Sequence, residues 1–485
     1  MAVNLGSLVK NLSLWSAGGD GRLRGFDKLG STPADVRAFP NAMGMAALTR
    51  GAAGYSGTKS IAFVDNLNDT GAGSLREAVE GFGKEGTFVI FRTSGIINLA
   101  TTLFISSPFV TLAFQTSPSG ICIAGANLNI YQTTDIIMRH ARSRLGSHST
   151  VDETDAEALS IWNSDNVMID QSSFSWGKDE TVAVTSYGGT PFTRVTFSRC
   201  LVSQGLTDEA PEPNHGYAFL CNGSYAAGNS LDIHNTVFPH HQGRLPQIAG
   251  DTRCNLVNNV AYNFDGAVNS TIYLYDGSFD GIQINSIGCI TKAGTEGNLG
   301  VSYGGNAGEM IAFGEQGATP RQALYMRDNF GTERFFDTDP QWSVVDEFTS
   351  AFVSAQYQSL TPFPTTDGLP IIETTVNQDN FVELTSVIAS NCGATVPVRD
   401  EVDTAMVADT INSTGSWKAG SNYPADWGTY GNKAYPTSTA GDGITDDYWT
   451  HKGLSARGAL DLAPSKYLWI EEYINDLADR RYSHA

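Results

Sequence analysis

The stretch HHQGRLPQ, residues 240–247, gathers two histidines, an arginine and a proline beside a regular alternation of apolar and polar residues. Two interpretations are open. Glycine and proline favour a turn between two strands, while a loop edge of this kind could also present Arg244 to a substrate. A guanidinium can clamp a carboxylate with paired hydrogen bonds, but it is an awkward base because its pKa exceeds about 12. His240 and His241 are not expected to form a metal pair, because adjacent strand residues point to opposite faces.

Carboxylates are the second group of side chains that could do chemistry. Asp179 and Glu180 follow the run SFSWG, and Glu157 opens the run EALSIW. Taken alone, such residues are more often solvated surface groups, and Asp-Glu pairs also stand at 152–153 and 400–401. On neighbouring strands of a regular scaffold, however, such carboxylates could converge on one divalent cation. Calcium suits this arrangement, because it takes oxygen ligands in loose geometry.

The composition limits the partners of such a site. The chain has 485 residues with 51 acidic and 30 basic side chains, which gives a formal net charge of -21. A nucleic-acid partner is therefore not expected, and an acidic polymer is repelled unless cations or local arginines intervene. No apolar run is long enough to span a membrane, and the N-terminus is a poor secretory signal. Six cysteines without CxxC spacing predict buried free thiols.

A repeat between about residue 95 and residue 290 supplies the scaffold. Short alternating segments anchored on Val167, Val195, Leu231, Cys254 and Ile282 recur at spacings of 28, 36, 23 and 28 residues. Alternation with period two predicts strands with one buried face. Recurrence with variable insertions is typical of one solenoid coil per repeat. The sequence therefore predicts an all-β parallel β-helix whose coils stack about 4.8 Å apart.

The same pattern predicts the core and the loops. The longest insertions fall at 140–157 and 203–217, where loops on a rigid scaffold tend to carry function. Asn258 and Asn285 are expected near bends, where side-chain amides satisfy turn backbone groups. The residues expected to form inward columns are Val167 and Ile169, Val195 and Phe197, Leu231 and Ile233, and Ile282 and Ile284.

The chain divides into three expected parts. Residues 1–37 form an N-terminal arm, residues 38–395 form the β-helix with its long loops, and residues 396–485 form a C-terminal segment that packs on the solenoid. Apolar spacing predicts one helix over 400–411 and a second near the end, with Ser465 as a possible N-cap.

Several blocks, taken in order, resemble bacterial pectate lyases of polysaccharide lyase family 1. The most specific is VDNLNDTGAGSLREAV from Val64, and the resemblance covers roughly residues 38–290. It implies a right-handed parallel β-helix that cleaves polygalacturonate by β-elimination with calcium. The other blocks are AFPNAMGMAALTRGAAG from Ala38, EALSIWNSDNVMIDQSSFSWGKDE from Glu157, NHGYAFL from Asn214 and HHQGRLP from His240.

The resemblance also implies roles for single residues. The catalytic arginine of the family falls on Arg244. The first calcium-ligand carboxylate falls on Glu157, with Asp155 as a nearby candidate, and the next acidic site falls on Asp179 or Glu180. The residues expected to contact the sugar polymer are His215, Tyr217, His240, His241 and Trp176.

Some family positions differ in this chain. The histidine of a family DH motif is replaced by Gln171, which follows Asp170, and a second aspartate of some members is replaced by Ala183. The family's companion arginine is Ala249. These departures bear on calcium affinity and substrate choice rather than on the fold.

The chemistry expected of these groups is elimination across C4 and C5 of a uronate. The C5 proton is barely acidic while the neighbouring carboxylate is negative, so a cation that bridges protein and substrate carboxylates would spread the developing charge. Arg244 serves either as the base or as an electrostatic clamp, and the sequence leaves both roles open. It lies three strand repeats after Glu157, about 14 Å along the stack, which suits a polymer.

Three functions follow from this pattern. The first is an extracellular, calcium-assisted lyase acting on pectate or a related uronate polymer, expected to be a monomer if secreted. The second is a viral tailspike depolymerase of an acidic capsular polysaccharide, expected to be a trimer on the virion surface. The third is a non-catalytic carbohydrate-binding β-helix, which the departures at Gln171 and Ala183 favour.

Overall fold

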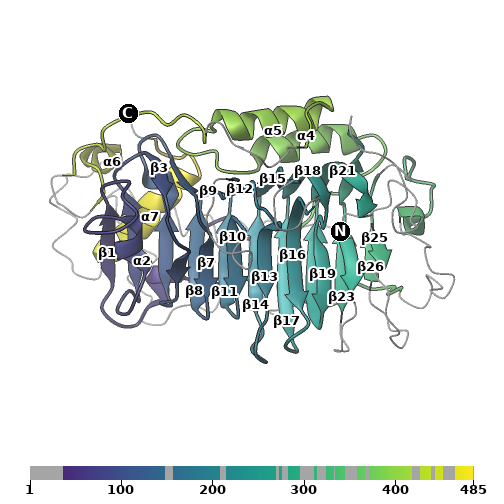
Figure 1. Cartoon of the computed structure of the whole chain (residues 1–485), viewed down its shortest axis with the longest axis horizontal. Helices are drawn as coiled ribbons and strands as arrows, with labels where there is room; N and C mark the ends of the chain where they lie inside the picture. The colour runs from purple at the N-terminus through teal and green to yellow at the C-terminus, as the bar shows by residue number, and fades with distance from the viewer. Residues whose placement is uncertain are drawn as a thin grey trace, which may run out of the picture.

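The chain folds into a right-handed parallel β-helix, as the repeat and the family resemblance predicted (Figure 1). Each coil supplies up to three short strands, so the solenoid has three faces, and each strand pairs in parallel with the equivalent strand of the next coil. The computed structural model describes residues 37–147, 157–207, 215–268, 272–275, 282–294, 311–313, 324–331, 334–344, 358–365, 371–417, 427–438, 443–451 and 465–483.

The first face, sheet A, runs the whole length of the described solenoid. Its strands are β1 Ser60–Val64, β2 Thr87–Phe91, β5 Val110–Ala113, β8 Thr134–Arg139, β11 Asp165–Asp170, β14 Thr193–Ser198, β17 Asn229–His234, β20 Thr252–Val257, β23 Gln283–Ile287 and β26 Leu324–Arg327.

The other two faces are joined by a single pairing between β16 and β18. The B1 face consists of β3 Gly95–Asn98, β6 Ile121–Ala124, β9 Arg142–Arg144, β12 Ser173–Ser175, β15 Leu201–Ser203, β18 Val237–Gly243, β21 Val260–Val268 and β24 Ile290–Lys292. The B2 face consists of β4 Leu103–Ile105, β7 Leu128–Tyr131, β10 Leu159–Trp162, β13 Glu180–Thr185, β16 Tyr217–Gly223, β19 Gln247–Gly250, β22 Ile272–Tyr275 and β25 Ile311–Phe313.

The core lies inside the solenoid and uses the predicted columns. The inward pairs of β11, β14 and β17 are fully buried in one apolar cluster, which confirms those positions. The fifth repeat was anchored two residues too early, because Cys254 pairs in register with Ile284 and not with Ile282, which is only partly buried. All six cysteines are buried and free, as predicted.

A tight turn joins sheet A to the B1 face in successive coils. Its first residue takes a left-handed conformation, with φ of 44° at Gln171, 54° at Arg199 and 51° at Asn258. Asn258 therefore stands at a bend, as predicted, and its amide donates to the Thr374 carbonyl at 2.7 Å. Asn285 was expected at a bend but lies within β23, where its amide donates to Asn255 at 2.7 Å.

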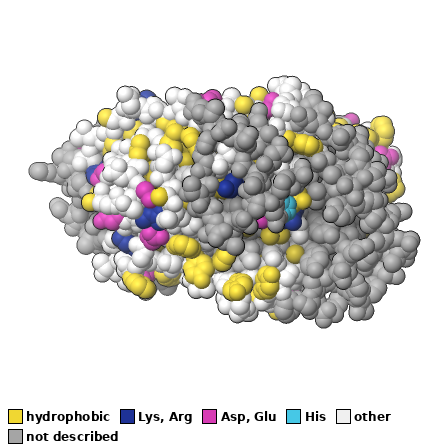
Figure 2. Space-filling model, viewed as in Figure 1, with side chains coloured by type: hydrophobic (Ala, Val, Ile, Leu, Met, Phe, Trp, Pro, Cys, Tyr) yellow, Lys and Arg dark blue, Asp and Glu magenta, His cyan; other side chains and the backbone are white. Residues whose placement is uncertain are grey.

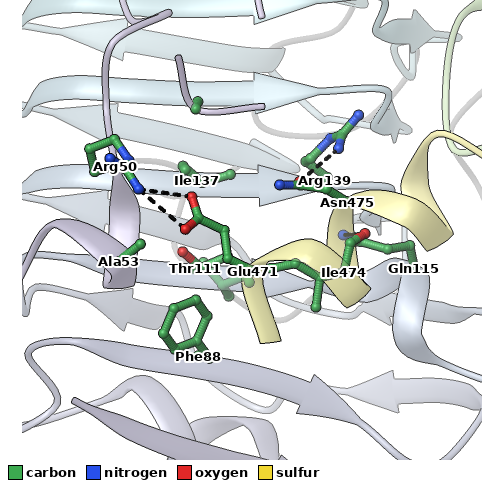
Figure 3. A pocket seen from close by; sticks show the side chains of 12 residues that line it. Arg50, Ala53, Phe88, Thr111, Gln115, Ile137, Arg139, Glu471, Ile474 and Asn475 are labelled. Atoms are coloured by element: carbon green, nitrogen blue, oxygen red, sulfur yellow. Dashed lines mark hydrogen bonds and ion pairs between the residues drawn. The ribbon is translucent and has the colours of Figure 1, made fainter. Parts of the chain in front are cut away.

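The outer side of sheet A is covered near its N-terminal end. Ala38 and Phe39 pack on Ile137 and Met168, and α7 (Ser465–Ala478) lies beside the short helix η1 (Gly51–Gly54). Figure 3 shows a small pocket under α7, where Arg50 donates to Glu471 at 3.1 Å. The other short elements are α2 Leu75–Val79, η2 Phe114–Thr116, η4 Gln341–Val344 and α6 Asp446–His451.

Two helices cover the B1 face, and Figure 1 shows them above it. The predicted helix is α5 (Glu401–Asn412), with Asp400 as its N-cap, and α4 (Phe381–Asn391) packs beside it although the sequence analysis did not anticipate it. A set of four buried charges, called the clamp below, ties α5 to the solenoid: Arg142, Arg144, Asp400 and Asp403. Within the described residues, no helix is long and apolar enough to cross a bilayer.

Candidate active site

The candidate residues lie where the chain passes from the B1 face to the B2 face. Glu157 precedes β10, Glu180 begins β13, Tyr217 begins β16 and Arg244 precedes β19. These four strands are consecutive neighbours in the sheet. The four residues therefore form a row along the solenoid axis, with one residue per coil, at steps of about 4.8 Å.

The row confirms the order that the sequence predicted, and it answers the question raised by residues 240–247. The segment contains both a strand and a turn: β18 ends at Gly243, and Arg244 turns the chain into β19 with a φ of 55°. Non-glycine residues are uncommon in this conformation and concentrate at sites where the fold holds them. The turn thus presents the Arg244 side chain at the edge of the B2 face.

Arg244 lies in a cluster with Glu180 and Tyr217. Its guanidinium forms an ion pair with the Glu180 carboxylate and lies 4.2 Å from the centre of the Tyr217 ring. The Glu180 side chain is 2% exposed, whereas 22% of the Arg244 side chain is exposed. The protein therefore holds the guanidinium from the inner side and leaves part of it open to a ligand.

A second pair adjoins this cluster. The Nδ1 atom of His215 lies 3.0 Å from the Asp179 carboxylate, and the His215 ring contacts the Tyr217 ring with centroids 4.3 Å apart. Tyr217 therefore touches both the imidazole and the guanidinium. The side chains of Asp179 and His215 are 35% and 19% exposed, so the pair reaches the surface.

Glu157 stands at the other end of the row. Its carboxylate accepts hydrogen bonds from the Ser160 hydroxyl at 3.2 Å and from the Asn127 amide at 3.3 Å. Asn127 and Ser160 were not predicted as site residues. A small polar residue at the outward position of β10 was the only signal for Ser160 in the sequence.

The described carboxylates do not gather into a cation site. Asp179 faces His215, Glu180 faces Arg244, and Glu157 faces an amide and a hydroxyl. Within the described ranges, no three acidic, histidine or cysteine side chains lie close enough to hold a metal ion. This donor set does not fit a resident calcium ion, and Asp155, the fourth predicted ligand, lies outside the described residues.

Three predicted substrate contacts are interior side chains. Trp176 is 1% exposed and packs against Trp427. His240 lies between Asn263 and Asp409 of the α5 helix, and His241 accepts from the Gly205 amide at 3.1 Å while its other nitrogen lies 2.9 Å from the Val202 carbonyl. The C-terminal segment covers Trp176 and His240, and His241 lies buried between Gly205 and Val202, so none of the three belongs to the proposed site.

Comparisons with known proteins agree with the family resemblance. The chain is 26% identical over 453 residues to a probable pectate lyase C of Aspergillus oryzae, covering 92% of this chain and 95% of the relative. It is 27% identical over 452 residues to a probable pectate lyase C of Aspergillus flavus, with the same coverage. The predicted resemblance to pectate lyases is therefore confirmed over nearly the whole chain. No model of a known protein family matches it.

Solved structures and a partial relative complete the comparison. A pectate lyase of Bacillus sp. N165 in complex with trigalacturonate has a TM-score of 0.45 and 14% identity, covering 73% of this chain and 99% of that one. The major allergen from cedar pollen has a TM-score of 0.48 and 16% identity, covering 75% and 96%. A probable pectin lyase B of Aspergillus niger is 30% identical over 125 residues, which is 23% of this chain and 31% of that protein.

Proposed function

We propose that this chain, similar to pectate lyases over 92% of its length, is a polysaccharide lyase that cleaves pectate or a related polyuronate by β-elimination. The observation that carries the proposal is the connected group formed by Arg244, Glu180, Tyr217, His215 and Asp179 at the edge of the B2 face. This group offers a cation and an imidazole that both contact the Tyr217 ring, and these are the two functions that the elimination requires.

Arg244 is assigned the role of clamp. Its ion pair with buried Glu180 favours the charged guanidinium, which makes it poorly suited to accept a proton. A charged guanidinium can instead donate paired hydrogen bonds to the carboxylate of the reacting sugar. It then stabilises the negative charge that develops on that carboxylate as the C5 proton leaves.

His215 is assigned the role of base. The Asp179 carboxylate lies 3.0 Å from Nδ1, and the proposal assigns proton transfer to the other ring nitrogen, Nε2. The C5 proton passes to Nε2, the electron pair of the C5–H bond becomes the C4–C5 double bond, and the C4–O bond breaks. The departing sugar oxygen takes one proton from water, and the imidazolium returns its proton to solvent.

The test is the appearance of the ultraviolet absorbance of the C4–C5 double bond with polygalacturonate as substrate. His215→Gln is expected to lower kcat by about 100-fold, because the base is lost. His451→Gln, in α6, is the matched control and is expected to leave turnover unchanged. Wild-type kcat in His215→Gln would remove the imidazole from the mechanism.

Calcium, which the resemblance implies, is tested separately. Because Arg244 supplies a cation and the described carboxylates are engaged by other partners, we expect turnover to persist after chelation. Complete loss of turnover with chelator, restored by calcium, would contradict this and would make the ion part of the working site.

The remaining proposals concern partner and location. The relatives are named lyases rather than capsule depolymerases or binding proteins, which favours the first of the three functions over the other two. An acidic polysaccharide is the proposed partner, and a monomer acting outside the cell is the proposed state. Sedimentation of the purified chain distinguishes a monomer from the trimer expected of a tailspike.

A further inference from the structure

Aromatic side chains form a stripe on the edge of the B2 face opposite the candidate active site. The aromatic stripe consists of Phe104, Tyr131, Trp162, Tyr187 and Tyr225. They belong to five successive coils, on or just after β4, β7, β10, β13 and β16. Figure 2 shows hydrophobic side chains gathered along the lower edge of this side of the molecule.

The rings contact one another in two groups along the solenoid axis, Phe104 to Trp162 and Tyr187 with Tyr225. Ring centroids are 5.7 Å apart for Phe104 and Tyr131, 6.2 Å for Tyr131 and Trp162, and 6.0 Å for Tyr187 and Tyr225. Tyr187 and Tyr225 are 63% and 51% exposed, and Phe104 is 37% exposed. With one ring per coil, the stripe extends over four strand spacings, about 19 Å.

Hydrogen bonds hold the backbone that carries the two most exposed rings. Asn163, which follows Trp162, donates to the Tyr187 carbonyl at 3.0 Å and accepts from the Tyr187 amide at 2.6 Å. The Tyr225 amide donates to the Ser186 hydroxyl at 3.3 Å. The backbone that carries the two rings is therefore already ordered before a ligand binds.

The electrostatic surroundings select the ligand. Charged side chains beside the stripe are ion-paired: Asp165 with Arg194, and Glu80 with Arg76. A stripe of this kind favours uncharged pyranose faces, because aromatic rings stack on apolar C–H surfaces and no carboxylate is attracted.

We infer that the aromatic stripe binds methyl-esterified uronate units of the polymer whose unesterified units reach Arg244. The inference rests on the proposed function. The stripe and the row of site residues lie at opposite edges of one face, about 16 Å apart, which is five residue steps from Glu157 to Trp162. The rings are tilted by 49° to 77° from one another, which fits a single twisting chain rather than the flat surface of a crystalline glycan.

Binding esterified units at the stripe raises the effective concentration of the remaining polymer at the site. A long polymer with mixed esterification therefore gains from the stripe, whereas an unesterified oligomer carries no esterified unit for the stripe to bind. This difference separates the stripe from the catalytic group in one experiment.

The test uses the full chain with the double variant Tyr187→Ser/Tyr225→Ser. The expected result is about a tenfold lower kcat/KM on long, partly esterified polygalacturonate, with kcat/KM on the unesterified hexamer unchanged. Phe335→Ser/Phe336→Ser removes two other exposed rings, 52% and 59% exposed, and is expected to change neither value. Equal losses on polymer and hexamer, or no loss on either, would overturn the inference.

Affinity electrophoresis supplies a readout that does not depend on turnover. Gels containing highly esterified polygalacturonate are expected to retard the wild-type chain and the control more than the stripe variant. Retardation by the unesterified polymer that depends equally on the stripe, or its displacement by cellohexaose, would overturn the assignment to esterified units. Lack of turnover on the hexamer with retardation intact would instead reject the proposed function and keep the stripe.

Discussion

Two clusters of arginine and acidic side chains on this solenoid differ in their exposure to solvent. The clamp on the B1 face is closed, because Arg144 and Asp403 are completely buried and each has charged partners within 2.9 Å. The cluster at the edge of the B2 face is open, because Glu180 is buried but Arg244 is partly exposed. The same residue types therefore hold a helix in one place and offer a charge to a ligand in the other.

The difference lies in what covers each face. Helix α5 lies over the B1 face, and Asp400 and Asp403 at its N-terminus form ion pairs with the arginines. The arginine charges are therefore neutralised within the protein. Burial alone raises the pKa of Asp400, but Arg144 and Arg142 outweigh it and hold the pKa well below its usual value. A carboxylate held in its charged form in this way is a structural group, not a catalytic acid.

The largest expected effect comes from removing the open arginine. Arg244→Ala is expected to lower kcat/KM on polygalacturonate by about 100- to 1,000-fold, because the developing charge on the substrate carboxylate loses its donor. The free energy of unfolding is also expected to fall, because buried Glu180 loses its ion-pair partner, so kcat/KM is compared per folded molecule. Steady-state kinetics and urea unfolding measure the two quantities.

The control for this change is another arginine with an exposed ion pair. Arg327 lies on β26 and forms an ion pair with Glu373. Arg327→Ala removes this pair and is expected to leave kcat/KM unchanged. If Arg244→Ala kept wild-type turnover, the open cluster would be a surface ion pair and the comparison would fail.

The closed cluster is expected to show the reverse pattern. Arg144→Met is expected to lower the free energy of unfolding by about 3–5 kcal/mol, because Asp403 and Asp400 then share a single arginine in a buried site. Activity per folded molecule is expected to stay within about twofold, since the clamp lies under α5 and away from Arg244.

An exposed pair provides the matching control. Arg481→Met removes a partner of Asp476 in a pair whose arginine is 41% exposed, and is expected to cost less than about 1 kcal/mol. A clamp variant with unchanged stability but lost turnover would show that the B1 cluster, and not the B2 cluster, serves the reaction.

The fold could be predicted from the sequence, because the apolar pattern that specifies it is local and is repeated in each coil. Alternating apolar residues at β11, β14 and β17 specify both a strand and its buried face, and each coil repeats them. The row of Glu157, Glu180 and Arg244 was accessible for the same reason, because equal positions in successive coils must line up. The helix α4 was not anticipated, since the pattern had already dissolved before it.

The contacts of the site side chains could not be predicted from the sequence, because they depend on which face the C-terminal segment covers. Trp176 and His240 were expected at the sugar-binding surface but pack against Trp427 and Asp409, more than 160 residues further along the chain. The pairing of Arg244 with Glu180 was also missed, since a long side chain reaches across two strands and no local pattern records that reach.

The comparison extends to two histidines, His241 in the closed interior and His215 at the open edge. Burial lowers the pKa of His241 to about 3, although the Val202 carbonyl opposes the shift. An unfolded histidine titrates near 6.5, so below about pH 6.5 the unfolded chain gains a proton that the folded chain refuses. Stability is therefore lost as the pH falls from about 6.5 toward about 3.

His241→Gln is expected to make this acid loss shallower, by about 2 kcal/mol between pH 7 and pH 5. The amide can still accept from Gly205 and donate toward Val202, which limits the cost at neutral pH. Urea unfolding at the two pH values measures the difference, with exposed His451→Gln as the control. An unchanged acid slope would mean that His241 is protonated in the folded chain, and the closed interior would then hold charge as readily as the open edge.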